Sequence, residues 1–129
     1  MSMLTDIHSY LTANGQGTNL FIGSLPDSPD VVAGIFQYQG RPPAEVLEVL
    51  GIRRERPGLQ VQVRSSPNAY ADAEARAYAI YDLLQVANAT LGSGFYQEVR
   101  PFGSPFPLGR DANRRVVIAA NYLVSRDWT

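Results

Sequence analysis

The chain has 129 residues, of which 45% are hydrophobic, and its formal net charge is -1. A chain of this length and apolar content is typical of one globular domain, so we expect residues 1–129 to form a single domain. The small net charge excludes bulk attraction to nucleic acid or to an anionic membrane, and the absence of cysteine and lysine excludes disulfides, thiolate chemistry and Schiff-base catalysis.

The N-terminal region predicts one short helix followed by two strands. Apolar residues recur at helical spacing between Leu4 and Leu11, and the glycine-containing segment 14–17 then interrupts the pattern. Residues 20–23 and 31–38 are runs of apolar, β-branched and aromatic side chains, which are typical of strands. No segment has the length and apolarity of a membrane span or the pattern of a secretion signal, so we expect a soluble protein that is made and used in a cytoplasm.

Residues 39–56 have the weakest pattern in the chain. Their apolar positions suit a short helix or an edge strand, and we interpret the segment as an excursion between two strands. It contains two prolines and alternating charge, so we expect it to be the most mobile part of the isolated protein. Residues 59–64 then alternate apolar and polar side chains, as a half-buried strand does.

A long alanine-rich helix is predicted next. Ser66 is the expected N-cap and Pro67 the first helical residue, while Asp72 places negative charge near the positive end of the helix dipole. The alanines alternate as in a strand, but alanine is a strong helix former and a poor strand former. A stripe of mostly small residues from Tyr70 to Ala87 would let this helix lie close against a sheet, and a glycine-rich turn ends it.

The C-terminal third predicts two more strands separated by a loop. Residues 95–100 and 116–124 are the strands, and the second is long enough to be central in a sheet. Residues 101–113 between them are too apolar for a simply solvated loop. Asp111 and Asn113 fit a hairpin turn, which would leave the neighbouring arginines available for other contacts.

The order of these elements predicts an α+β fold. Read along the chain, it is helix, strand, strand, excursion, strand, helix, strand, strand. Helices grouped on one face of a sheet are the usual packing for such an order. We therefore expect a mainly antiparallel or mixed sheet of four to five strands with two helices packed on one face.

The sequence offers little material for catalysis. His8, the single histidine, lies at the edge of an apolar helix face and lacks the three or four convergent ligands that a metal site needs. Asp27 and Asp30 could bind a divalent cation, but carboxylates beside proline and serine are ordinary turn formers. The glycine clusters lack the spacing of nucleotide-binding loops. We expect no catalytic residue, no metal site and no cofactor, and no enzymatic activity.

Contacts with other proteins explain the remaining basic and apolar side chains better than catalysis does. Acidic neighbours cancel much of the charge around residues 53–56, which favours a mixed-charge protein interface or a solvated loop over a nucleic-acid site. Exclusive use of arginine also suits interfaces, although genome composition explains it equally well. The residues expected at protein interfaces are basic or apolar: Arg53, Arg54, Arg56, Phe102, Phe106, Leu108, Arg110 and Trp128.

Three segments carry a resemblance to a known class of proteins. In residues 56–64 a Pro-Gly turn launches a strand that precedes the long helix; in residues 25–32 a proline-rich turn feeds a strand; and residues 107–115 lead into the apolar strand that contains Asn121 and Tyr122. Over residues 20–125 the chain resembles the minor capsid or tail-terminator (tail completion) proteins of long-tailed bacteriophages.

This resemblance implies a virion structural protein of α+β build. Such a protein forms a ring, expected to be a hexamer, that caps the tail tube, ends tube polymerisation and joins the tail to the head-side connector. The implied partners are further copies of the chain, the tail-tube protein and a head-tail connector or stopper protein, with no membrane, and genome DNA passes through the ring without sequence-specific binding. The implied location is the tail-neck region of the virion, after assembly in the host cytoplasm.

Two alternatives remain open at the level of the sequence. Another neck component, such as a head-closure or head-tail joining protein, fits the same patterns and is poorly separated from a terminator. A small enzyme that uses His8 or carboxylates is the less favoured alternative.

Overall fold

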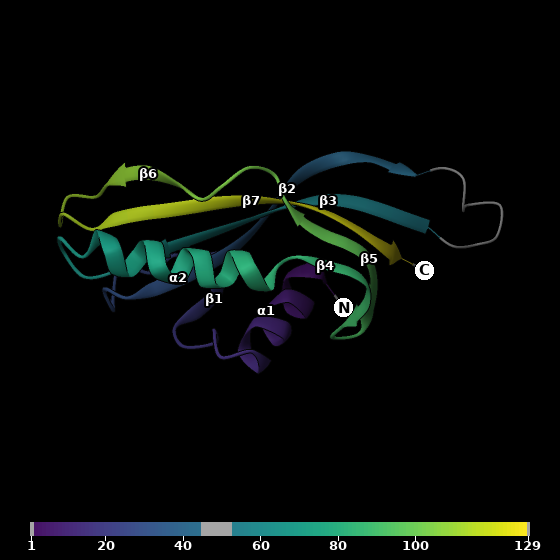
Figure 1. Ribbon diagram of the computed structural model, residues 1–129, viewed down its shortest axis with the longest axis horizontal. Helices are drawn as coiled ribbons and strands as arrows, with labels where there is room; N and C mark the ends of the chain where they lie inside the picture. Colours follow the sequence, from purple (N-terminus) through teal and green to yellow (C-terminus); the bar gives the residue numbers. More distant parts are fainter. Residues whose placement is uncertain (1, 45–52, 129) are drawn as a thin grey trace.

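The computed structural model describes residues 2–44 and 53–128, which form one curled, mixed, seven-stranded sheet with two short helices (Figure 1). Its elements in chain order are α1 (Met3–Ala13), β1 (Leu20–Ile22), β2 (Val32–Ala44), β3 (Arg53–Arg64), α2 (Tyr70–Leu83), β4 (Val86–Leu91), β5 (Gly94–Pro101), β6 (Phe106–Arg110) and β7 (Val116–Trp128). Neither helix is long and apolar enough to cross a membrane, a finding that covers the described residues.

The strand order across the sheet is β1-β2-β3-β7-β5-β4, with β6 also paired to β7. β1 and β2 are parallel, and every other pair is antiparallel. β7 pairs with β3 along one edge, and along its other edge it pairs first with β6 and then with β5. β7 is therefore the central strand, as its length and apolar character predicted.

The predicted α+β fold class is wrong, because the molecule is mostly β and has seven strands instead of four to five. Residues 86–91, assigned in part to the helix, form β4, and the predicted apolar loop contains β6. β2 and β3 also extend into the predicted excursion, whose remaining residues 45–52 lie outside the described part of the chain. These segments become strands because they pair with a neighbouring strand, and their local composition does not reveal that pairing.

The proline in β6 shows why that strand was not predicted. Pro107 has no N–H to give to a ladder, and prolines within sheets are confined to edges, where the missing N–H faces away from the partner strand. Among the described residues β6 pairs with β7 alone, and an irregularity falls between Pro107 and Gly109. A proline is therefore compatible with this strand, although it argues against a strand in the sequence.

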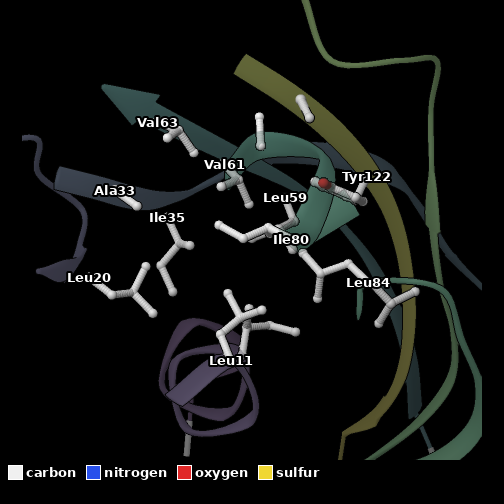
Figure 2. Packing of buried hydrophobic residues seen from close by; sticks show 14 of the residues in the cluster. Leu11, Leu20, Ala33, Ile35, Leu59, Val61, Val63, Ile80, Leu84 and Tyr122 are labelled. Atoms are coloured by element: carbon white, nitrogen blue, oxygen red, sulfur yellow. The ribbon is translucent and has the colours of Figure 1, made fainter. Parts of the chain in front are cut away.

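Both helices lie on the same face of the sheet, where their apolar side chains form one core with those of the strands. Figure 2 shows Leu11 of α1 and Ile80 of α2 pointing toward Ile35 and Leu59 on the sheet. Leu11, Ile35, Leu59 and Ile80 are all 0% exposed. Full burial of each such side chain stabilises the fold by roughly 1.5–3 kcal/mol.

The long helix packs through its small side chains, as predicted, but its ends differ from the prediction. α2 begins at Tyr70 with Ala69 as N-cap and without a capping side chain among the described residues, so Ser66 is not the cap. Ala77 is 4% exposed against the sheet. The helix ends at Leu83, before the predicted limit, because the chain turns there to enter β4.

The opposite face of the sheet, here called the outer face, carries no helix within the described residues. Alternation along the strands gives it polar and aromatic side chains. Gln60 Nε2 donates to Asn121 Oδ1 at 2.9 Å, and Gln62 Nε2 donates to Gln60 Oε1 at 2.8 Å. The ring of Tyr38, which is 40% exposed, lies over Gly58 on the same face. This face is therefore open to a partner.

Candidate protein-interface site

An open hollow of about 300 Å³ on the outer face, here called the arginine pocket, lies across β2, β3, β7 and β5. Its lining is mainly basic and polar: Arg41, Arg54, Arg56, Gln97, Glu98 and Ser125. The register of the sheet assembles this set, because Arg41 lies opposite Arg56 on β2 and β3, and Glu98 lies opposite Ser125 on β5 and β7. Each of these strands presents alternate residues to the outer face.

Several of the arginines already hold carboxylates of the same molecule. Arg41 Nη2 lies 3.3 Å from Glu98 Oε1, and Arg100 Nε lies 3.3 Å from Glu98 Oε2. Arg54 Nε is 3.7 Å from Asp127 Oδ1, a contact of opposite charges that is too long for a hydrogen bond. These side chains are about one-third to one-half exposed, so each pair contributes little to stability and can exchange partners.

The pocket also has donors without acceptors. The Nε atoms of Arg41 and Arg54 are buried and have no hydrogen-bond partner among the described residues. The Nε of Arg56 donates to the carbonyl of Pro42 at 2.6 Å, which fixes that side chain across the hairpin. A guanidinium presents five N–H donors, so the arginines of the pocket can donate hydrogen bonds to further carboxylate oxygens.

The structure brings together two of the residues predicted for this cluster and adds one that was missed. Arg54 and Arg56 both line the arginine pocket. Arg53 lies opposite Trp128 at the ends of β3 and β7, and only the backbone of these two predicted residues is described. Arg41 was missed because it belonged to the predicted excursion, and only the pairing of β2 with β3 places it opposite Arg56.

Of the other predicted interface residues, Phe106, Leu108 and Arg110 lie beside the start of β7, whereas Phe102 lies beside its middle, where its N–H donates to the carbonyl oxygen of Asn121 at 2.8 Å. Phe102, Phe106 and Leu108 are 66%, 37% and 52% exposed, and the last two belong to the edge strand β6. Leu108 and Arg110 line a second open hollow of about 240 Å³. β6 pairs with residues 116–119 of β7, whereas the pocket lies beside Ser125, so the two sites are roughly 20–25 Å apart along the strand.

A buried arginine occupies a cluster of carboxylates that was predicted to be a set of simple turns. Arg115, with a side chain only 3% exposed, contacts Asp27 Oδ1 at 2.6 Å, Asp30 Oδ1 at 3.0 Å and Asp111 Oδ2 at 2.8 Å. The hydrogen bond to Asp27 is the main reason that the pKa of Arg115 is raised. Arg115 is therefore not available for outside contacts, contrary to the prediction for the arginines beside this turn.

A second arginine holds the same loop through backbone carbonyls. Arg64 Nε donates to Asp30 O at 3.0 Å, and its Nη2 donates to Pro26 O at 2.6 Å and to Pro29 O at 2.8 Å. Burial lowers the pKa of Arg64, and the neighbouring charge of Arg115 adds to this effect. The two arginines fix the proline-rich loop before β2, which explains why Asp27 and Asp30 serve structure.

Asp111 should make the free energy of unfolding depend on pH in the acidic range. Burial raises its pKa, but hydrogen bonds from the backbone N–H groups of Arg115 and Asn113 and from the Arg115 guanidinium outweigh burial and hold the pKa below its ordinary value. Because the pKa is lower in the folded state, this stabilisation is present above the unfolded-state pKa of about 4 and is lost as the pH falls through the folded-state value.

Asp111→Asn is therefore expected to lower the free energy of unfolding at neutral pH and to make its decline in acid shallower. Urea denaturation across a pH series measures both quantities. Glu74→Gln, which changes an exposed carboxylate away from the ends of α2, is the matched control and should decline with acid as the wild type does. Equal slopes for Asp111→Asn and wild type would contradict the role given to Asp111.

A buried carboxylate in α1 was not singled out from the sequence. Asp6, 1% exposed, accepts from Tyr96 Oη at 2.7 Å through Oδ2 and from Ser93 N at 3.1 Å through Oδ1. Arg126 Nη1 lies 3.7 Å from the same Oδ2, and its Nε donates to Glu55. Asp6 lies in the first turn of α1, where acidic side chains are common, and only the tertiary fold shows that it joins α1 to the β4–β5 turn and to β7.

The candidates for catalysis have structural contacts. His8 Nε2 lies 3.0 Å from the carbonyl oxygen of Leu20, which ties α1 to β1. Within residues 2–44 and 53–128, no group of three or more histidine, aspartate or glutamate side chains is arranged to hold a metal ion.

The pattern of the family described as bacteriophage tail terminator protein matches residues 10–128. The chain belongs to this family. The recognition made from turn and strand patterns is therefore confirmed, and the tail terminator described here is a structural protein of a phage tail.

A solved structure supports the fold of this tail terminator independently. A chain from the virion of a native gene transfer agent (GTA) particle superposes with a TM-score of 0.72, covering 98% of this chain and 96% of that chain at 14% sequence identity. At this identity the likeness concerns the fold alone. A search of curated proteins gives no match.

Proposed function

We propose that this protein forms a ring that caps the tail tube, ends tube polymerisation and joins the tail to the head-side connector. Family membership supports a structural part in the tail, since tail terminators are phage tail proteins. Within this proposal residues 1–129 act as one domain, copies associate as a hexamer in the neck of the virion after assembly in the host cytoplasm, and genome DNA passes through the ring without sequence-specific binding.

The observation that best supports ring formation is the exposed apolar set on and beside β6. Phe102, Phe106 and Leu108 lie within seven residues of one another on a sheet edge and face water in the single chain. Large exposed apolar side chains gathered in one short segment are typical of surfaces that a partner covers. Large aromatic side chains are also the residues that contribute most to interfaces.

The arginine pocket supplies a second and chemically different surface. It lies far along β7 from the β6 set, so one copy can contact two neighbours or two kinds of partner at once. A head-to-tail contact requires two different patches on each subunit, and repetition of that contact closes a ring when the rotation is right. The tube protein and the connector are the further partners in this proposal.

Phe106→Ser is expected to weaken assembly far more than folding. Phe106 is already 37% exposed in the single chain, so its loss removes little of the core but removes an aromatic contact with the neighbour. We expect the concentration for half-assembly, measured by analytical ultracentrifugation, to rise at least about tenfold. Thermal unfolding of the dilute monomer should change little.

Phe95→Ser is the matched control, because Phe95 is 40% exposed but lies on β5 at the β4–β5 hairpin. It should assemble like the wild type. The assignment of β6 to a subunit interface would be wrong if both variants assembled equally well. It would also be wrong if Phe106→Ser destabilised the dilute monomer as much as it weakened assembly.

A further inference from the structure

One exposed stripe of α2 carries negative charge. Glu74, Tyr78 and Asp82 follow one another at four-residue spacing, and all three are exposed. Residues four apart lie on one side of a helix, so the carboxylates flank the tyrosine ring along a single line. Arg76 does not neutralise them, because its Nη2 donates to the carbonyl oxygen of Thr18 at 2.6 Å.

The position of Asp82 is not explained by helix stability. It lies in the last turn of α2, where the helix dipole is negative, and that turn contains no basic residue. Asp72 differs, since it lies in the first turn and is favoured by the dipole. A carboxylate that opposes the dipole is better explained by a positive group brought by a partner.

The arginine pocket has the complementary chemistry. Around it the described charges are four arginines, at positions 41, 54, 56 and 100, against the carboxylates of Glu98 and Asp127. Two buried Nε donors there have no acceptor among the described residues. An arriving carboxylate would meet the exposed parts of these guanidinium groups, since the side chains of Arg41, Arg54 and Arg100 are about one-third to one-half exposed. Arg-carboxylate hydrogen bonds are among the stronger ones in proteins.

The dimensions of the two surfaces also agree. Glu74 and Asp82 are eight residues apart on a helix, which separates them by about 12 Å. The pocket extends over β2, β3, β7 and β5, which are three strand spacings or about 14 Å across. A helix laid across these strands could place a carboxylate near each side of the pocket, with Tyr78 over the guanidinium groups.

We propose that the arginine pocket of one copy binds the Glu74–Tyr78–Asp82 stripe of α2 on the next copy in the ring. The inference rests on the proposed ring and names one of its contacts. The pocket opens on the outer face, whereas α2 covers the opposite face of the sheet, so the two patches cannot meet within one molecule. The contact is therefore head-to-tail, and in the ring the outer face of each sheet is covered by the neighbour's helix.

Two charge reversals test this contact. Arg56→Glu changes the pocket at a residue that contacts a backbone carbonyl instead of a carboxylate, and Asp82→Arg puts a positive charge where the helix dipole favours it. Both variants should remain folded by circular dichroism. Each alone should raise the concentration for half-assembly by about tenfold or more, because like charges then face each other.

An equimolar mixture of the two variants should assemble again. In an alternating ring, the altered pocket of one variant meets the altered helix of the other, and the unaltered pocket meets the unaltered helix. Native mass spectrometry should show rings with equal numbers of both chains. Asp72→Arg, which lies on another flank of α2, is the matched control and should assemble like the wild type.

The outcomes separate this contact from the ring itself. A wild-type protein that stays monomeric at every concentration would overturn both proposals. If the wild type forms rings and the two variants do so equally well, the ring stands and the contact is wrong. The contact is also wrong if each variant fails to assemble and the mixture fails as well, since the pocket and the helix would then contact other surfaces of the neighbouring copies.

Discussion

Ala77→Glu is expected to unfold much of the protein at physiological temperature. Ala77 is 4% exposed and belongs to the hydrophobic core where α2 packs on the sheet, so a glutamate at this position would bring a carboxylate into the core. Burying a charge or distorting the packing to avoid burial costs several kcal/mol, against a total stability of about 5–15 kcal/mol. Thermal and urea denaturation of the purified variant measure this loss.

Ala75→Glu provides the control for this substitution. It places the same side chain on the exposed face of the same helix, so its free energy of unfolding should remain close to that of the wild type. In a phage complementation assay we expect Ala77→Glu to give overlong or headless tails and Ala75→Glu to give plaques. Equal stability of the two variants would mean that the helix does not pack on the sheet through Ala77.

Asp6→Ala is expected to cause the second largest loss of stability. The carboxylate is 1% exposed, and its removal leaves the buried hydroxyl of Tyr96 and the partly buried backbone N–H of Ser93 without their acceptor. Loss of these two hydrogen bonds should cost about 2–5 kcal/mol, because buried donors that lose their acceptor keep their desolvation penalty. Urea denaturation at neutral pH is the measurement.

Two comparisons make the Asp6 experiment specific. Ser9→Ala, on the exposed side of the same helix, should have little effect. A double-mutant cycle of Asp6→Ala with Tyr96→Phe should show a coupling energy, because removal of the hydroxyl also removes one of the donors left unpaired. Additive effects in the cycle, or a loss for Asp6→Ala no greater than that for Ser9→Ala, would contradict the role given to this network.

The elements that the sequence predicted well have patterns that are complete within one segment. The spacing of Leu4 and Leu11 correctly predicted α1, and the alternation in residues 59–64 correctly predicted the core of β3. The family was recognised from local turn and strand signals of the same kind, although one of the predicted turns was wrong, because Pro57 and Gly58 lie inside the continuous strand β3. β4 was missed because its Ala87 and Ala89 are compatible with a helix, and only pairing with β5 makes them a strand.

The interface candidates could be predicted as residue types but not as a site. Arg54 and Arg56 alternate along one strand, so the sequence indicated that they share a face, but nothing local places Arg41 or Glu98 beside them. The buried role of Arg115 was missed for a similar reason. Its partner Asp27 is 88 residues away in the chain, and single-sequence patterns carry no information about such contacts.

The proline in β6 bears on how copies of this protein can associate. An exposed sheet edge with regular N–H and C=O groups invites another edge to join it, and such joining continues without limit into fibres. Pro107 and the irregular step at Gly109 break the regular row of groups on this edge, so backbone pairing between copies is disfavoured there. Copies must then associate through side-chain contacts, and contacts of fixed geometry can produce a closed ring instead of an open fibre. A protein proposed to stop the growth of one polymer thus carries, at its own edge, a feature that opposes the growth of another.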